Sequence, residues 1–397
     1  MYYRPAVKGP VAIVGAGYVG LPLAQVFAGA GNRVVLVEAN PEKVELVKRG
    51  ESYIRDVPSE ELAPLVESGA IEITSSYNVL AEADAILIAL QTPLTAQREP
   101  DLSIVLGAAG DIAPRLQKRQ LVVLESTTYP GTTRERLRPI LEGGSGKIVG
   151  GLTPACTERA VELYSRALKT VHPVSSPEAA ELTKLLENIF RSVNIALVNE
   201  LAQLCDRMQI DVWEVIGAAA TKPFGFMSFQ PGPGLGGHCM PIDPFYLTWK
   251  AREYDFYTEF IELAGKVNEN MPYWCLGKIA RALNANEKAL KGSKVVILGV
   301  SYKADIDDTR ESPALKLIEL LQEAEADVSY HDPFVPELPE QGLSSTALDP
   351  AAADCVVIVT AHSGIDYDAL VEQAPLVVDL RNATGRDGTG NGKVWKL

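Results

Sequence analysis

The 397-residue sequence lacks the long hydrophobic segments that mark membrane proteins. Its longest apolar runs, such as Ala85–Leu90 and Val356–Val359, have the size of a strand. A membrane-spanning helix needs roughly 18–20 apolar residues. The N-terminus also lacks the charged start and small-residue cleavage site of a secretory signal. We therefore expect a globular protein with no membrane partner.

A surplus of positive charge is absent as well. Lys and Arg number 37, Asp and Glu number 51, and the formal net charge is −14. Nucleic-acid-binding proteins favour basic faces, so this charge argues against a nucleic-acid partner. It leaves room for a small anionic ligand, because local cations and backbone N–H groups decide such binding.

Cysteine is scarce, with one residue at each of positions 156, 205, 239, 275 and 355. An odd and scattered set does not form a disulfide framework. A reducing, cytoplasmic location is the natural expectation for such a chain. Because the chain has no CxxC pair and only four histidines, we expect no metal site.

Short apolar runs stand near both ends of the chain. They are unbroken rather than alternating, which is typical of parallel strands covered on both faces. The runs are Val11–Val14, Val34–Glu38, Ile71–Thr74, Ala85–Leu90, Leu121–Glu125, Lys294–Gly299, Asp327–Tyr330, Cys355–Thr360 and Leu376–Asp379. Ser312 with Pro313 is expected to open a helix between two of the later strands.

The middle of the chain is helical in pattern. Ser176 as N-cap, followed by Pro177, predicts a helix that runs to about Met208. A second helical pattern runs from Thr258 to about residue 284 and is expected to break at Met271–Pro272. The fold class is therefore α/β, with two Rossmann-like doubly wound parallel-sheet domains joined by a long-helix central domain. The expected domains are 1–174, 175–286 and 287–397.

The stretch GAGYVG at 15–20 lies between a predicted strand and a predicted helix. Gly15 permits the tight turn, Gly17 lets a pyrophosphate approach, and Gly20 allows close packing of helix and strand. Glu38 follows twenty-one positions after Gly17, where a carboxylate can accept a hydrogen bond from a ribose 2′-hydroxyl. The pattern favours NAD over NADP. A nucleotide-free turn, or a merely solvated Glu38, remains the alternative.

Hydroxyl side chains follow two further predicted strands, in Gln91-Thr92-Pro93 and in Glu125-Ser126-Thr127-Thr128. In an open α/β sheet, ligands bind at the carboxyl ends of the strands. These hydroxyls are therefore candidates to contact the cofactor or to position water. Capping of the next helix is the alternative for each of them.

Three polar residues interrupt the first long helix. Lys184 and Asn188 are four apart and share a face, and Asn199 lies three turns further on near the same face. Their neighbours are mostly apolar, so the helix is expected to be largely buried. A buried lysine or amide needs a partner. A solvated polar stripe is the alternative.

Cys239 stands in the glycine- and proline-rich stretch GLGGHCMPIDP at 234–244. Too few large side chains surround it to form a core, and no companion ligands for a metal are near. Beside NAD, a thiolate could add to an aldehyde and form a thiohemiacetal, which a second oxidation converts to a thioester that water releases as a carboxylate. Lys184 and Asn188 would stabilise the alkoxide-like oxygen, and Asp243 would orient the groups. An inert buried cysteine remains the alternative.

The chain resembles the UDP-glucose/GDP-mannose dehydrogenase family over nearly its whole length. The motifs that carry this resemblance are GAGYVGLPLA at 15–24, ESTTYPGTT at 125–133, the Lys184/Asn188 helix with Asn199-Glu200, GGHCMPIDP at 236–244 and GVSYKADIDDTRESPA at 299–314. The form of residues 221–247 is most similar to the UDP-N-acetylglucosamine 6-dehydrogenase branch.

The resemblance implies a homodimer, joined through the central helices, that oxidises C6 of UDP-N-acetylglucosamine or a related UDP-hexose to a uronate. It implies a C-terminal domain that binds the UDP-sugar. The implied catalytic residues are Cys239, Lys184, Asn188, Asp243 and Thr127. The implied NAD-binding residues are Gly15, Gly17, Tyr18, Val19, Gly20, Glu38, Thr92, Pro93, Ser126 and Thr127. The implied substrate-binding residues are Lys184, Asn188, Phe224, Gly236, Lys303 and Arg310.

Two features depart from the family pattern. Gly143–Gly146 reads GGSG where the family usually carries a further strand and a loop with a catalytic glutamate. Such a stretch resembles an artificial linker. Phe224–Pro233 lacks the arginine that often reaches the partner chain's site. A catalytically impaired or non-catalytic binding homologue is therefore an alternative, and so is a two-electron dehydrogenase with an inert cysteine.

Overall fold

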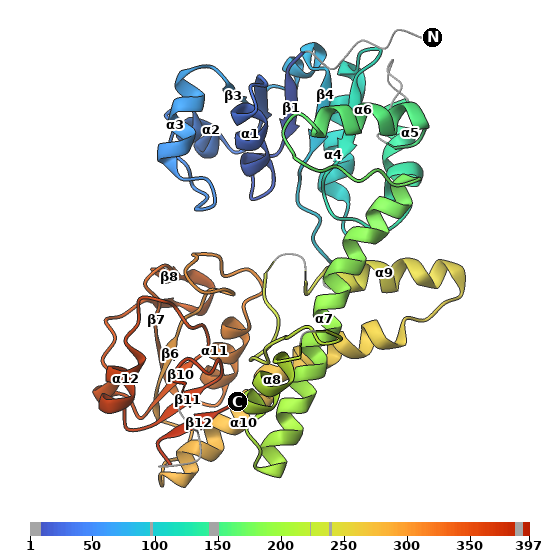
Figure 1. The fold of residues 1–397 in the computed structure, drawn as a ribbon. Helices are drawn as coiled ribbons and strands as arrows, with labels where there is room; N and C mark the ends of the chain where they lie inside the picture. The colour runs from blue at the N-terminus through green and yellow to red at the C-terminus, as the bar shows by residue number, and fades with distance from the viewer. Residues whose placement is uncertain (1–8, 96–97, 143–150, 223, 238–239, 386–391) are drawn as a thin grey trace. The chain divides into compact units, whose positions relative to one another are not determined.

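The computed structural model describes residues 9–95, 98–142, 151–222, 224–237, 240–385 and 392–397 (Figure 1). The chain divides into two compact units. The first holds the chain up to residue 186 together with residues 245–255. The second holds residues 187–244 and 256–397. Helix α7 (Pro177–Met208) begins in the first unit and continues into the second.

A five-stranded parallel sheet forms the centre of the first unit, in the order β3-β2-β1-β4-β5. The strands are β1 (Val11–Val14), β2 (Val34–Val37), β3 (Ile71–Thr74), β4 (Ala85–Ile88) and β5 (Leu121–Leu124). In register, Val11 pairs with Val34 on one side and with Ala85 on the other. The strand order reverses between β1 and β4, and this reversal opens a crevice at the carboxyl edge of a doubly wound sheet.

Helices cover both faces of this sheet, as the unbroken apolar runs predict. One face packs against α1 (Gly20–Gly29), α2 (Pro41–Lys48), α3 (Ser59–Glu67) and α6 (Pro154–Tyr164). The other face packs against α4 (Ser103–Ile112) and α5 (Arg138–Glu142). Successive residues of β1 divide between the two cores, with Val11 and Ile13 in one and Ala12 and Val14 in the other.

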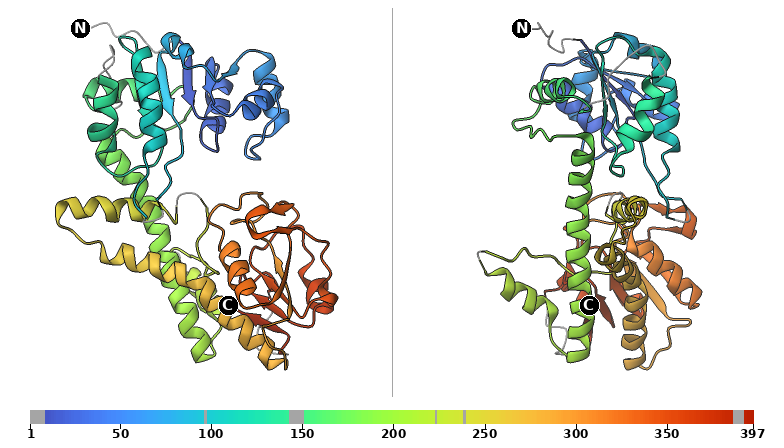
Figure 2. Two further views of the ribbon diagram at one scale, coloured as in Figure 1. Left: turned by 180° about the vertical axis from the view of Figure 1, so that it is seen from behind. Right: turned by 90° about the vertical axis from the view of Figure 1, so that its right-hand side faces the viewer.

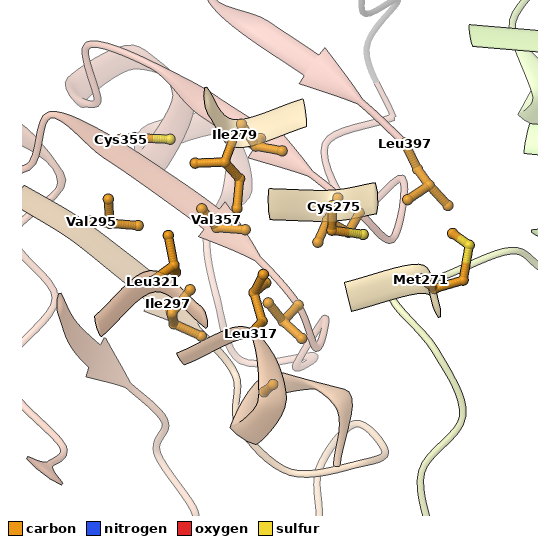
Figure 3. Close-up of a cluster of buried hydrophobic side chains, with 14 of the residues drawn as sticks. Met271, Cys275, Ile279, Val295, Ile297, Leu317, Leu321, Cys355, Val357 and Leu397 are labelled. Atoms are coloured by element: carbon orange, nitrogen blue, oxygen red, sulfur yellow. The ribbon is translucent and has the colours of Figure 1, made fainter. Parts of the chain in front are cut away.

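The second unit contains a similar parallel sheet in the order β12-β11-β10-β6-β7. Its strands are β6 (Lys294–Leu298), β7 (Asp327–His331), β10 (Cys355–Ile358), β11 (Val377–Asp379) and β12 (Val394–Lys396). Helices α10 (Glu259–Ala285) and α11 (Pro313–Glu323) cover one face, where Ile279 and Leu317 meet Val357 (Figure 3). Helix α12 (Tyr367–Gln373) covers the other. The two sheets confirm the predicted fold class.

Helix α10 packs against the part of α7 that lies in the second unit (Figure 2). The two helices share one hydrophobic core, and a buried ion pair joins Lys278 Nζ to Asp206 Oδ1 at 2.6 Å. The N-terminus of α7 is capped as predicted, because Ser176 Oγ accepts a hydrogen bond from the Ala179 N–H at 3.2 Å. Ser312 likewise caps α11 by accepting from the Ala314 N–H.

The predicted break at Met271–Pro272 is wrong, because α10 continues through Pro272. Proline lacks the N–H that would bind the carbonyl of Asn268, one turn earlier. A Cβ placed on Gly234 would lie 3.3 Å from that carbonyl oxygen and 3.7 Å from Pro272 Cδ. The glycine- and proline-rich segment therefore packs against the point where the proline interrupts the hydrogen bonds of the helix.

Several short helices and strands were not predicted from the sequence. They are α8 (Val212–Ala220), α9 (Asp243–Ala251), β8 (Glu337–Leu338), β9 (Leu343–Ser344) and β12. Several strands also end one or two residues before their apolar runs do, because the last residues leave the sheet at its carboxyl edge. Among the described residues, no helix combines the length and hydrophobicity needed to cross a bilayer.

We expect Gly20→Ala to destabilise the first unit by about 3 kcal/mol, because overpacking against rigid backbone is costly. A Cβ at this position would lie 1.8 Å from the Gly15 oxygen, so the turn would have to move. The matched control is Gly29→Ala at the exposed end of the same helix, where a Cβ meets nothing within 4 Å. Urea unfolding measures both variants, and equal stabilities would refute this packing role for Gly20.

Candidate active site

The glycine turn after β1 has two glycines that packing requires and one that it does not. Gly15 has a φ of +101°, and its Cβ would lie 2.5 Å from the Ala89 oxygen. Gly20 is pressed against Gly15, as described above. At Gly17 a Cβ would meet nothing within 4 Å. The open space at Gly17 fits the close approach of a pyrophosphate, for which only glycine leaves the backbone accessible.

Glu38 follows β2 and closes this turn. Its carboxylate accepts hydrogen bonds from the Ala16 N–H at 3.0 Å and from the Asn40 N–H at 2.9 Å. The side chain is partly exposed, and a carboxylate offers about four acceptor sites. Glu38 is therefore more than a solvated strand end, and it retains capacity for a ribose hydroxyl. Tyr18 and Val19, also predicted to bind the cofactor, are exposed beside the turn. These residues fit an NAD molecule.

Two hydroxyls at the ends of β4 and β5, those of Thr92 and Ser126, bind backbone rather than capping helices. Ser126 Oγ donates to the Leu90 oxygen at 2.7 Å and accepts from the Leu90 N–H at 3.0 Å. Thr92 Oγ1 donates to the Thr127 oxygen at 2.8 Å. The carbonyl oxygens of Thr92 and Pro93 in turn accept from the buried Tyr246 hydroxyl of α9. These bonds fix the two strand ends next to each other at the sheet edge.

A cavity of about 320 Å³ within the first unit brings together several predicted residues. Ser126, Thr127 and Lys184 line it. Thr128 lines it too, and its buried Oγ1 has no hydrogen-bond partner among the described residues. A buried hydroxyl without a partner is costly unless a ligand or water satisfies it. Thr128 belongs to the Glu125–Thr128 segment whose hydroxyls were candidates to contact the cofactor or position water, although the family resemblance did not assign it a role.

Glu125 lines the same cavity and accepts a hydrogen bond from the Tyr164 hydroxyl. Burial raises the pKa of the Glu125 carboxyl, and the bond from Tyr164 only partly opposes this shift. Burial also raises the pKa of the Tyr164 hydroxyl. Burial of the carboxyl at the end of β5 therefore shifts it toward its protonated form.

The raised pKa of Glu125 predicts that Glu125→Gln gains stability relative to wild type as the pH rises. Because the folded pKa exceeds the unfolded value, the stability that Glu125 contributes is complete below that unfolded value and declines as the pH rises through the folded pKa. Glutamine stays neutral and can still accept from Tyr164. We expect the melting temperature of the variant to rise relative to wild type as the pH increases. Glu67→Gln, at the exposed end of α3, is the control with the same change in charge, and a parallel trend there would contradict the assignment.

Asn188 and Asp243, 55 positions apart in sequence, meet in the second unit. Both are buried, at 1% and 2% exposed. Asn188 Nδ2 donates to Asp243 Oδ2, and Asn188 Oδ1 accepts from Arg191. Lys184 lies one turn earlier on α7, and its residue is exposed.

Asn199 is also buried and has partners, as a buried amide requires. Its Nδ2 donates to Asn268 Oδ1 on α10, and its Oδ1 accepts from the Gly232 N–H, each at 2.9 Å. The amide thus attaches the glycine- and proline-rich segment to α10. The expectation that α7 is largely buried is wrong for the single chain, because one face leaves large apolar side chains exposed. They are Leu182, Leu186, Phe190, Leu197, Leu204 and Met208.

In the second sheet, Asp332 follows β7 as Glu38 follows β2 in the first. Asp332 is buried and accepts from the backbone N–H groups of four residues and from His362. The four backbone donors are Val300, Ser301, Phe334 and Val335. These bonds occupy the acceptor sites of the carboxylate. Asp332 therefore differs from Glu38, which accepts from two backbone N–H groups and retains capacity for a ribose hydroxyl.

Among the predicted substrate-binding residues of the second unit, Arg310 contacts the described part of the cysteine loop. Lys303 is exposed, and Arg310 pairs with Asp308 at 2.6 Å. The Arg310 oxygen accepts from the Gly237 N–H at 3.0 Å. A Cβ on Gly236 would lie 2.5 Å from Tyr302 Cβ, so a part of the protein itself approaches this glycine.

Arg381, which follows β11, is a cation that sequence reasoning missed. Its Nε donates to the Val359 oxygen at 2.8 Å, and a Cβ on Gly232 would lie 2.5 Å from its Nη1. Burial lowers the pKa of this guanidinium. In the described part of the chain, no carboxylate forms an ion pair with it. A basic residue two positions after a predicted strand was the available signal, because strand ends meet at one sheet edge.

Cys239 and its neighbour His238 lie outside the described residues, as does the GGSG stretch. The other four cysteines are free and buried. Burial raises the pKa of Cys275 to about 12 and also raises the pKa values of Cys205 and Cys355.

Phe224, a predicted substrate-binding residue, is largely exposed. Across the described ranges, no group of three or more His, Cys, Asp or Glu side chains is placed to hold a metal ion.

Three domain models of one family match the chain. The NAD binding domain of the UDP-glucose/GDP-mannose dehydrogenase family matches residues 10–151. The central domain matches residues 178–270, and the UDP binding domain matches residues 296–386. Together the three matches cover most of the chain.

Individual relatives agree with the family match. The chain is 34% identical to a UDP-N-acetyl-D-mannosamine dehydrogenase of Escherichia coli, over 89% of this chain and 93% of that protein. It is 33% identical to an NDP-N-acetyl-D-galactosaminuronic acid dehydrogenase of Ralstonia nicotianae, over 94% and 95%. The solved UDP-D-ManNAc dehydrogenase of Pyrococcus horikoshii is similar with a TM-score of 0.88, at 29% identity over 98% and 99% of the two chains. The chain therefore belongs to the UDP-glucose/GDP-mannose dehydrogenase family, and its cofactor is NAD.

Proposed function

We propose that this protein oxidises C6 of a UDP-N-acetylhexosamine to the uronate in a four-electron reaction that uses Cys239. The observation that carries the proposal is the buried hydrogen bond between Asn188 and Asp243. It joins the polar face of α7 to the residue four positions after Cys239. An amide and a carboxylate held beside a cysteine loop fit nucleophilic catalysis. The buried state of the other cysteines supports Cys239 as the nucleophile.

Each residue has a distinct part in the proposed chemistry. NAD held by the turn at Gly17 and by Glu38 would supply the hydride acceptor for each oxidation, so two NAD would be consumed per sugar. The Cys239 thiolate adds to the C6 aldehyde, and the new thiohemiacetal oxygen takes a proton. Oxidation at C6 gives a thioester, which water cleaves to the carboxylate and the free thiol. Lys184 and Asn188 stabilise the negative charge on the oxygen during these additions.

The relatives and the sequence support the proposed substrate class. The relatives described above are named for UDP-N-acetyl-D-mannosamine and for an NDP-N-acetyl-D-galactosaminuronic acid. The form of residues 221–247 favours UDP-N-acetylglucosamine. All of these sugars carry a 2-acetamido group, so we propose a UDP-2-acetamido sugar, with UDP-N-acetylglucosamine as first choice. Exposed Lys303 and paired Arg310 would contact the diphosphate.

We also propose that the protein acts as a homodimer. Within the second unit, α7 exposes Phe190, Leu197, Leu204 and Met208, between 45% and 64% of each side chain. They recur every four or seven residues, the spacing at which helices pack along a common seam. A second copy of α7 would bury them. Light scattering tests this, with twice the chain mass of 42.8 kDa as the expected result.

Intact mass spectrometry tests the covalent step. We expect protein incubated with the UDP-sugar and NAD to gain the mass of the oxidised UDP-sugar, joined to Cys239 through its C6 acyl group. Alkylation of the thiol beforehand should prevent this gain. A binding homologue without catalysis, which the family match does not support, would bind both ligands without any change in mass. Accumulation of the adduct with slow release would instead indicate that the missing acidic loop limits hydrolysis of the thioester.

A further inference from the structure

The loop after β6 carries Lys303, and neighbouring strand ends hold its backbone. Thr360 Oγ1 donates to the Ser301 oxygen at 2.6 Å, and Ser301 Oγ donates to the Lys303 oxygen at 2.8 Å. The Ser363 N–H donates to Asp305 Oδ1 at 2.9 Å. The loop is therefore fixed on both sides of Lys303, although the lysine side chain itself is exposed.

His362 is the buried centre of this arrangement, with 1% of its surface exposed. Its Nδ1 accepts from the Asp305 N–H at 3.0 Å. Because a backbone N–H can only donate, Nδ1 carries no proton. Its Nε2 lies 3.1 Å from Asp332 Oδ2 and therefore donates to that carboxylate. The imidazole connects the loop to the end of β7.

The two bonds of His362 restrain both ends of the loop. At one end, Asp332 Oδ2 also accepts from the N–H groups of Val300 and Ser301. At the other end, Asp305 has a φ of +64°, a left-handed conformation that is unfavourable for a non-glycine residue. The bond from its N–H to His362 stabilises that conformation. Without an acceptor at Nδ1, the Asp305 turn would lose this restraint.

The same loop supports the glycines before Cys239. Tyr302 lies against Gly236 and Gly237, and a Cβ on Gly237 would lie 3.0 Å from its ring. Gly237 itself donates its N–H to the Arg310 oxygen. A shift of the loop would therefore displace Lys303 and the packing of Gly236–Gly237 together.

We propose that His362 is a positioning residue for the UDP-sugar, which acts through the Asp305 turn to hold Lys303 and Tyr302 in place. The proposal rests on the proposed function, because it assigns His362 to the binding of that substrate. His362 lies beneath the loop and contacts its backbone, so it acts on the nucleotide through other residues. Phe334 packs against its ring at a centroid distance of 5.0 Å, and the Tyr367 hydroxyl donates to its carbonyl oxygen.

Two conservative variants separate positioning from simple stability. The amide oxygen of His362→Asn can take the place of Nδ1 and accept from Asp305, but the donor to Asp332 is lost. The amide nitrogen of His362→Gln can take the place of Nε2 and donate to Asp332, but the acceptor for Asp305 is lost. The control is His331→Gln, because the His331 imidazole contacts the Thr346 oxygen, and its backbone bond from the Gly299 N–H is kept in the variant.

Calorimetric titration of the full-length protein with UDP, together with melting temperatures, tests the proposal. We expect His362→Gln to weaken UDP binding about tenfold, the typical effect of one lost hydrogen bond, with little change in melting temperature. KM for the sugar should rise while kcat is retained. His362→Asn should melt earlier yet bind UDP within about twofold of wild type. His331→Gln should match wild type.

The opposite result would overturn the positioning role. In that case His362→Asn would bind UDP weakly and His362→Gln would bind it as wild type does. Affinity losses that simply follow the loss of melting temperature in both variants would overturn it as well. If wild type bound UDP but His362→Gln bound it equally well, only this inference would fail. If wild type bound no UDP, the proposed function would fail and the inference with it.

Discussion

Cys239→Ser is expected to abolish uronate formation, with a fall in kcat of about a thousandfold or more, because the covalent step has no replacement. A serine hydroxyl is not ionised near neutral pH, so it does not form the thiohemiacetal. The measurement is chromatography of the sugar products after incubation with NAD. Uronate formation at the wild-type rate would eliminate Cys239 as the nucleophile.

Cys205→Ser is the matched control for this experiment. Cys205 lies in the same unit, in the core between α7 and α10, and burial raises the pKa of its thiol. We expect this variant to lose some stability and to keep its turnover. The contrast would show that loss of activity belongs to position 239 and not to removal of any thiol.

Asp243→Ala is expected to have the second-largest effect, in two parts. It leaves the buried Asn188 amide without its acceptor, which costs about 1–3 kcal/mol of stability. It also removes a carboxylate from the cysteine loop, for which we expect kcat to fall about a hundredfold or more. Urea unfolding and steady-state kinetics measure the two parts separately.

Asp243→Asn distinguishes structure from chemistry at this position. The asparagine oxygen can still accept from Asn188, so most of the lost stability should return. If the negative charge takes part in catalysis, kcat should stay low in this variant. Full activity of Asp243→Asn would show that Asp243 only holds Asn188 in place.

The sheets were predictable because parallel strands buried on both faces are encoded in local apolar runs. The predictions Val11–Val14 and Ile71–Thr74 coincide with β1 and β3. Strand β12 has three residues, too few for a periodic pattern. The course of α10 through Pro272 was not predictable, because packing of Gly234 against it is a contact between distant segments.

The candidate site was predictable where it is local and unpredictable where it is not. The turn with Gly17 and its partner Glu38 lies within one strand–helix–strand unit, so spacing alone identified it. Asn188 was identifiable as a polar residue on an apolar helix, but its bond to Asp243 depends on tertiary folding. The acceptor sites of the Asp332 carboxylate are occupied by hydrogen bonds, and burial lowers the pKa of the Arg381 guanidinium. Both features depend on contacts between strand ends that sequence spacing does not encode.

The yield of NADH per mole of UDP-sugar consumed tests the central claim most directly. The panel should contain UDP-N-acetylglucosamine, UDP-N-acetylmannosamine and UDP-glucose, so that the same assay also identifies the sugar. A four-electron oxidation through a thioester predicts two NADH for each sugar and a uronate as the product. One NADH per sugar with a carbonyl product, unaffected by alkylation of the thiol, would contradict it.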